Sequence, residues 1–141
     1  MILYLATFAL VPLLVEEAGS RVCGELWDAA DQVVTTRLTH VEATAALAMA
    51  QRLGRIGAED LLVARAHLAE LWAAMNILEL DGRLMVAASE AAVLLGLRGY
   101  DAVHYAAAVT LTDESLVAAA GDARLLGAWR DAGVSVVDTA V

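Results

Sequence analysis

Short apolar runs alternate along the chain with longer segments whose apolar residues recur at helical spacing. The runs typical of buried strands occupy residues 2–5, 32–35, 77–80, 116–119 and 134–137. Helical spacing predicts helices over residues 8–17, 20–30, 37–53, 58–75, 84–95, 100–111 and 122–132. This alternation predicts an α/β fold of three layers, with a central, mainly parallel sheet flanked by helices.

Proline and glycine refine two of these segments. Pro12 is awkward inside a helix over residues 8–17 unless it lies in a first turn, because proline has no amide hydrogen to donate. Gly54 follows the helix over residues 37–53 and is typical of a helix end. The helices on either side of Gly54 are therefore expected to form a hairpin.

Length and composition bound the architecture. The chain has 141 residues, without a Pro- or Ser-rich linker or a visible repeat, so we expect one domain over residues 1–141. Hydrophobic residues make up 60% and charged residues 19%, which excludes intrinsic disorder. The opening apolar run over residues 1–15 is too short to span a bilayer and lacks a basic start, so a cytoplasmic protein is expected.

The charge balance narrows the function. Nine basic residues face 18 acidic ones, which gives a net charge of −9. Such a surface repels nucleic acid at long range and disfavours a protein that binds DNA or RNA by electrostatics alone. An enzyme that recruits nucleic acid through bound metal ions is compatible with this charge.

Three carboxylates occupy unusual positions. Glu42 falls in an otherwise apolar helical stripe, where it needs a partner or a cleft, unless it reaches solvent at the edge of the stripe. Asp101 and Asp122 stand at helix starts, where each could be a plain N-cap. Asp122 also follows a strand, at the carboxyl edge of the sheet where α/β folds bind ligands.

Convergence of these acids would have a chemical consequence. Clustered carboxylates repel one another, and oxygen ligands of this kind favour Mg²⁺ or Mn²⁺. A site of this type supports metal-assisted hydrolysis of a phosphodiester. The alternative is a structural domain in which all three acids only stabilise the fold.

The remaining polar and aromatic residues favour structural roles. His104 lies three residues after Asp101, and a hydrogen bond to the protein is its favoured role. His40 and His67 have no second ligand at metal spacing. The lone Cys23 is expected in the core. The three tryptophans are expected in the core or in an interface: Trp27, Trp72 and Trp129.

Three segments in order along the chain resemble a PIN domain and, more narrowly, the VapC toxins of bacterial toxin–antitoxin modules. These segments are residues 97–104 (LRGYDAVH), residues 39–42 (THVE) with Ala46-Leu47 after them, and residues 116–126, which include Asp122. The resemblance runs over nearly the whole chain. It implies a small endoribonuclease that uses Mg²⁺ or Mn²⁺ held by four acids, commonly a homodimer silenced by a VapB antitoxin.

The resemblance assigns three of the four acids. Glu42, Asp101 and Asp122 match family positions, whereas Ala6 stands where the first metal-binding aspartate would be and Phe8 where a small hydroxyl residue would be. Asp101 is then the main remaining metal ligand, and Glu42 and Asp122 complete the site or orient the attacking water. Under this hypothesis, Arg98 or Arg37 is the candidate for a contact with the phosphate.

Loss of one ligand from such a site predicts impaired cleavage. Two explanations for Ala6 stay open: deliberate inactivation, which a single Asp-to-Ala change favours, and natural degeneration, which Phe8 favours. The leading hypothesis is a metal-dependent ribonuclease that is inactivated in this chain. The alternative is a PIN-like binding module that engages antitoxin or RNA without cleavage.

Overall fold

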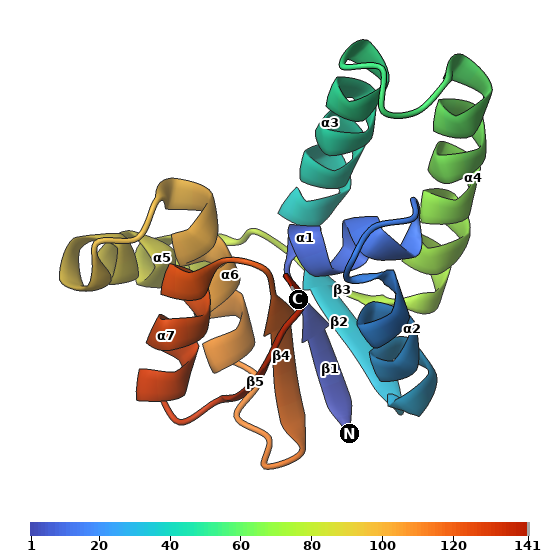
Figure 1. Cartoon of the computed structure of the whole chain (residues 1–141). Coiled ribbons are helices and arrows are strands. Elements are labelled where there is room, and N and C mark those ends of the chain that lie inside the picture. Colours follow the sequence, from blue (N-terminus) through green and yellow to red (C-terminus); the bar gives the residue numbers. More distant parts are fainter. Residues whose placement is uncertain (141) are drawn as a thin grey trace.

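Five parallel strands form a single sheet in the order β3-β2-β1-β4-β5 in the computed structural model, which describes residues 1–140 (Figure 1). The last residue of the expected domain, residue 141, lies outside the described part. The strands are β1 (Ile2–Leu5), β2 (Gln32–Thr36), β3 (Asn76–Leu78), β4 (Leu116–Ala120) and β5 (Ser135–Asp138). All five predicted strands are confirmed.

The strand order places a switch point beside β1. From β1 the chain builds outward through β2 to β3, and then returns to add β4 and β5 on the other side. Leu3 is therefore paired with Val33 on one side and with Val117 on the other. In open α/β sheets a crevice forms beyond the carboxyl ends of the strands at such a point.

Strand β1 is apolar because both of its faces are covered. Leu3, Tyr4 and Leu5 are all fully buried. Tyr4 packs into one hydrophobic cluster, whereas Leu3 and Leu5 pack into the other, as the alternation of side chains along a strand requires. The sheet is thus the middle of three layers, which confirms the predicted fold class.

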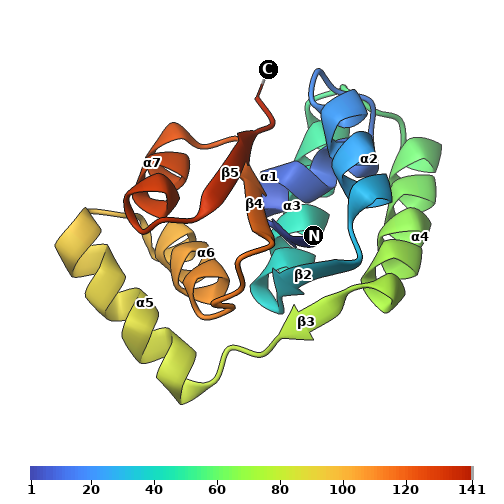
Figure 2. The ribbon, with the colours of Figure 1, turned by 90° about the horizontal axis from the view of Figure 1, so that it is seen from below.

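Helices cover both faces of the sheet. One layer consists of α5 (Gly82–Leu95), α6 (Gly99–Val109) and α7 (Ala123–Asp131), which lie together on one side in Figure 2. The other layer contains α1 (Thr7–Leu10), the 3₁₀ turn η1 (Val11–Leu13), α2 (Ser20–Ala29), α3 (Leu38–Arg52) and α4 (Ala58–Ala74). Helices α3 and α4 form the predicted hairpin, which projects from the sheet in Figure 1.

The helix predicted over residues 8–17 is wrong in its second half. Helix α1 ends at Leu10, and the chain continues as the 3₁₀ turn, with Pro12 near the start of that turn. Proline is tolerated there because the first amides of a helix have no partner within it. Within residues 1–140, we find no helix that is both long and apolar enough to cross a membrane.

Candidate active-site cleft

A cleft of about 1000 Å³ opens beyond the carboxyl ends of β1 and β4. Helices α1 and α3 contribute one wall, and α6 with the start of α7 contributes the other. The structure brings all three acids singled out from the sequence to this cleft. It also places Ala6 there, the residue that the resemblance aligns with a metal-binding aspartate. The lining includes Ala6, Thr7, Glu42, Arg98, Asp101, His104 and Asp122.

Ala6 sits at the junction of β1 and α1. Its amide donates a hydrogen bond of 3.0 Å to the carbonyl of Ala119 in the neighbouring strand, so the backbone here belongs to the sheet. Ala6 is the N-cap residue of α1 and offers no side-chain oxygen to that helix end. Position 6 therefore presents a methyl group at the point where the resemblance leads us to expect a carboxylate.

Glu42 is held by two hydrogen-bond donors from other elements. Thr7 Oγ1 donates to Glu42 Oε1 at 2.7 Å, and His104 Nε2 lies 2.9 Å from the same oxygen. Burial of the Glu42 carboxyl acts to raise its pKa, but the hydrogen bonds from His104 and Thr7 together lower it below the usual value. Glu42 thus has both features expected of it, a partner in His104 and a place in a cleft, and its side chain stays 19% exposed there.

A buried tyrosine sets the orientation of His104. Tyr4 is fully buried, and its hydroxyl lies 2.7 Å from His104 Nδ1. Burial raises the pKa of Tyr4 well above the usual value, so the hydroxyl keeps its hydrogen. A neutral ring that accepts this hydrogen at Nδ1 carries its own on Nε2, which faces Glu42 and Thr7.

The two aspartates are bridged by one arginine. Arg98 Nε lies 3.0 Å from Asp101 Oδ2, and Arg98 Nη2 lies 3.2 Å from Asp122 Oδ2. Burial is the main cause that raises the pKa of Asp101, and the nearby Asp122 adds to it, while Arg98 opposes both. Arg98 therefore offsets the repulsion between two carboxylates that share one wall of the cleft.

The two helix-start interpretations have different outcomes. Asp122 is the N-cap of α7, since its Oδ1 accepts a hydrogen bond of 3.0 Å from the amide of Leu125. The N-cap interpretation of Asp101 is wrong, because Arg98 occupies that position of α6 and Asp101 lies inside the first turn. The carboxyl of Asp101 does not cap the helix and instead accepts a hydrogen bond from Arg98 Nε.

The acids as they stand do not form a ready metal site. Over the described residues, no three His, Cys, Asp or Glu side chains are grouped closely enough to hold a metal ion. Glu42 is bound by Thr7 and His104, both aspartates are bound by Arg98, and position 6 has no side-chain oxygen. Carboxylate oxygens suit a hard divalent cation, but these three acids are engaged with protein groups instead.

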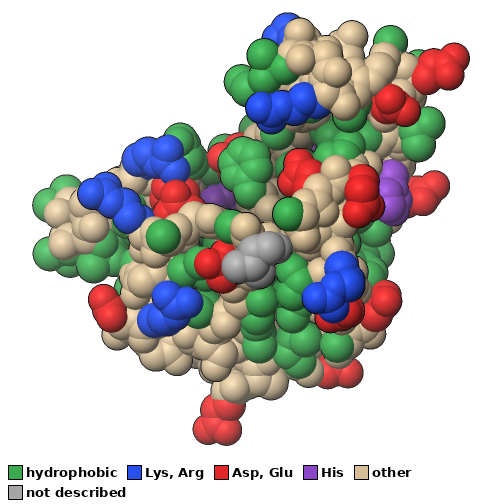
Figure 3. All heavy atoms as spheres, viewed as in Figure 1, with side chains coloured by type: hydrophobic (Ala, Val, Ile, Leu, Met, Phe, Trp, Pro, Cys, Tyr) green, Lys and Arg blue, Asp and Glu red, His purple; other side chains and the backbone are tan. Residues whose placement is uncertain are grey.

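The opposite part of the cleft is apolar. Phe8 is 59% exposed and Met49 is 54% exposed, although both line the cavity. Val11, Val15 and Ile56 also line the cleft, and the charged residues Glu16, Glu17 and Arg55 lie next to them in the sequence and share the lining. Figure 3 shows acidic and basic side chains mixed over the viewed face rather than separated into large patches of one sign. The cleft thus combines a charged wall with an apolar wall.

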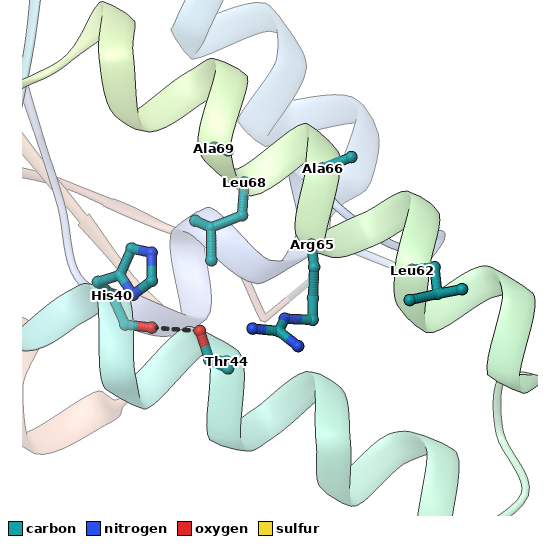
Figure 4. A pocket seen from close by; sticks show the side chains of 7 residues that line it. All are labelled: His40, Thr44, Leu62, Arg65, Ala66, Leu68 and Ala69. Atoms are coloured by element: carbon teal, nitrogen blue, oxygen red, sulfur yellow. Dashed lines mark hydrogen bonds between the residues drawn. The ribbon is translucent and has the colours of Figure 1, made fainter.

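Two basic residues predicted from the sequence lie in different places. Arg98 lines the cleft, whereas Arg37 is not among the cleft residues and instead pairs with Glu79 beyond β3. A separate cavity of about 340 Å³ lies between α3 and α4, where Arg65 points toward Thr44 and His40 (Figure 4). No acidic residue lines that cavity, so it does not share the chemistry of the cleft.

Sequence reasoning did not single out two members of the cleft network. Tyr4 is hidden in an apolar strand run, and Thr7 in a short helix next to Ala6. His104 was expected to bond to the protein, and this is confirmed, but its contact with Glu42 links residues 62 positions apart. The only signal for Thr7 was its place at the start of the helix that follows β1, one residue after Ala6.

Comparison with known proteins places the chain in a family. No family model matches it. It is 37% identical over 124 residues to Ribonuclease VapC45 of Mycobacterium tuberculosis, a match that covers 88% of this chain and 86% of that protein. The structure is similar to PAE2754 of Pyrobaculum aerophilum, with a TM-score of 0.71, 27% identity, and coverage of 97% of this chain and 92% of that one.

A toxin–antitoxin complex from Klebsiella pneumoniae contains a chain with the same fold. The TM-score is 0.67 at 14% identity, and the match covers 96% of each chain. The chain belongs to the VapC family of ribonucleases.

Proposed function

We propose that the protein is the ribonuclease toxin of a VapBC-type pair, and that cleavage is impaired in this chain because position 6 carries alanine. The observation that carries the proposal is the place of Ala6: it lines the same cleft as Glu42, Asp101 and Asp122, at the carboxyl end of the central strand. An aspartate at position 6 would supply a carboxylate from β1 to that cleft.

The metal is part of the proposal. We infer that the active form uses Mg²⁺ or Mn²⁺, because carboxylate oxygens are the ligands these ions prefer. In a chain with aspartate at position 6, Asp101 would be the main ligand beside it, and Glu42 and Asp122 would complete the set. A divalent ion would offset the charge on the phosphate, which the net charge of −9 otherwise repels.

The chain's own residues have separate roles in this proposal. Thr7 and His104 keep Glu42 ionised and fixed in direction, so that it can orient a water molecule against a bound phosphodiester. Arg98, beside Asp101 and Asp122 in the cleft, is the arginine that we assign to contact a phosphate, whereas Arg37 does not line this cleft and pairs with Glu79. RNA is the substrate class because the family is one of ribonucleases.

A second candidate function is supported by the state of the site. With Ala6 in place and the carboxylates of Glu42, Asp101 and Asp122 each bonded to a protein group, the chain can act as a module that engages antitoxin or RNA without cutting. We propose a VapB-type antitoxin as the protein partner, with the apolar wall around Phe8 and Met49 as the contact surface. We also propose a homodimer, which light scattering of the purified chain would test.

One experiment separates cutting from binding. The unchanged chain, Ala6→Asp and Ala6→Asn are incubated with total bacterial RNA and Mn²⁺, Mg²⁺ or a chelator, and the products are separated on a gel. Ala6→Asn is the matched control, because it adds a side chain of similar size without a carboxylate. We expect cleavage by Ala6→Asp alone, and its loss with the chelator.

If none of the three proteins cleaves RNA, the result would argue against the impaired-enzyme proposal. Phe8→Ser added to Ala6→Asp then tests whether the second departure from the family pattern blocks the cleft, since Phe8 is exposed on its wall. If the double variant is also silent on RNA from several sources, the binding-module function is favoured. Cleavage by the unchanged chain would show that position 6 is not required.

A further inference from the structure

Arg98 occupies the space between two carboxylates that the proposed function assigns to a cation. Its Nε and Nη2 atoms lie 3.0 Å and 3.2 Å from Asp101 and Asp122. These two acids come from different elements, the first turn of α6 and the N-cap of α7. A single guanidinium therefore bridges the two acids, in the place that the proposed function gives to a divalent ion.

Local structure holds the guanidinium in this place. Arg98 is the N-cap residue of α6, and its pairing with Asp101 spans three positions, so the side chain folds back over the first turn of its own helix. The ring of Tyr100 lies against the guanidinium, with 4.8 Å between Arg98 Cζ and the ring centroid. The bridge thus has three contacts, two of them encoded within the run from Arg98 to Asp101.

The electrostatics of the pair require a positive charge. The Asp101 side chain is only 10% exposed and the Asp122 side chain 35%, so solvent screens their repulsion only in part. One guanidinium supplies a single positive charge, whereas a divalent ion supplies two, but both compete for the same Oδ2 atoms. An ion that bridges these two atoms therefore competes with Arg98 for them.

We propose that Arg98 is an internal counter-ion that closes the Asp101–Asp122 pair to divalent cations, so that cation binding requires the guanidinium to move away. This inference rests on the proposed function for the identity of the ligand, and it adds a regulatory contact within the same cleft. A guanidinium displaced in this way stays beside the cleft, where it can meet a phosphate.

The test measures Mn²⁺ binding rather than RNA cleavage. Isothermal titration compares the unchanged chain with Arg98→Met, which keeps an unbranched apolar stem, removes the charge and adds no oxygen. Arg124→Met is the matched control: it removes the same charge from the start of α7, but Arg124 contacts the backbone carbonyl of Gly96 instead of a carboxylate. All three proteins are also prepared with Ala6→Asp.

We expect Arg98→Met to tighten Mn²⁺ binding by about tenfold in both backgrounds, within the usual range of coupling between two ligands of one site. Arg124→Met should tighten it much less, because only the long-range, salt-screened charge is lost. Asp122→Asn added to Arg98→Met should abolish the gain. In thermal melts, Mn²⁺ should raise the midpoint of Arg98→Met more than that of the unchanged chain.

Other results would overturn the inference. Equal tightening by Arg98→Met and Arg124→Met would mean that only net charge matters, and weaker binding by Arg98→Met would mean that Arg98 assists the ion. Absence of Mn²⁺ binding in all variants would also reject it. Circular dichroism checks folding, and Arg98→Ala replaces Arg98→Met if the latter unfolds. The RNA gel judges the proposed function separately, since Ala6→Asp can fail to cut while Arg98→Met still binds Mn²⁺.

Discussion

The hydroxyl of Tyr4 lies 2.7 Å from Nδ1 of His104, beneath the cleft floor, and this contact determines which ring nitrogen faces Glu42. The strand and the helix that supply these residues are 100 positions apart in the chain. Because both side chains are almost fully buried, water cannot replace either partner of the bond. The direction of the Glu42 carboxyl thus depends on a tyrosine that does not itself bond to it.

Replacement of Tyr4 by phenylalanine tests this dependence. We expect Tyr4→Phe to lower the free energy of unfolding by about 1–3 kcal/mol, because it leaves the buried Nδ1 atom of His104 without a partner. Chemical denaturation measures the change. Tyr100→Phe is the control, since Tyr100 is 43% exposed and its ring contact with Arg98 survives the change. Equal effects of both substitutions would contradict the role of the bond.

Ionised Glu42 should stabilise the fold in a pH-dependent way. Its pKa in the folded chain is depressed from the ordinary value of 4.5, with burial opposed by the hydrogen bonds from His104 and Thr7. Its stabilising contribution is therefore fully present above pH 4.5 and is lost as the pH falls through the lower folded value. We expect Glu42→Gln to cost about 2 kcal/mol at pH 7.

The measurement is urea denaturation of both chains from pH 3 to pH 7. The other carboxyl groups titrate in both proteins, so the difference between the two curves reports on position 42. That difference should be constant near neutral pH and should shrink at the acid end. A difference that grows toward low pH would show that the pKa of Glu42 is raised in the folded protein instead.

The capping role of Asp122 can be separated from its role in the cleft. We expect Asp122→Ala to lower the free energy of unfolding by about 1 kcal/mol, because the amide of Leu125 loses its acceptor, while Asp122→Asn keeps most of the cap. Asp81→Ala removes an equivalent cap from α5, away from the cleft. If Asp122→Asn and Asp122→Ala are equally destabilised in thermal melts, the cap is not the cause.

The thiol of Cys23 should resist alkylation in the folded protein. Cys23 is fully buried, and burial, with a smaller contribution from the charge of Glu17, raises its pKa from 9.0 to about 11. At pH 8 this shift alone reduces the thiolate fraction by about a hundredfold. Mass spectrometry after iodoacetamide treatment should find one modified thiol per chain in urea and almost none without it. Similar rates in both conditions would place Cys23 at the surface.

The layers of this protein follow from the pattern of apolar residues along the chain. Its apolar runs and helical stripes located every strand and helix within a few residues, because burial on both faces of a parallel sheet demands continuous apolar runs. The exception is the segment after Leu10, where Pro12 turns the helix into a 3₁₀ turn. Local chemistry also identified the N-cap at Asp122, whose partner lies three residues away.

The partners of the three acids, in contrast, depend on contacts between elements that are distant in the chain. The hydrogen bonds to Glu42 come from α1 and α6, and the link between Asp101 and Asp122 joins α6 to α7. Such contacts depend on the order of strands in the sheet, and no periodicity along the chain encodes them. The residue types along the chain therefore pointed to the carboxylates. Their network with Tyr4, His104 and Arg98 depends on the order of the strands around β1.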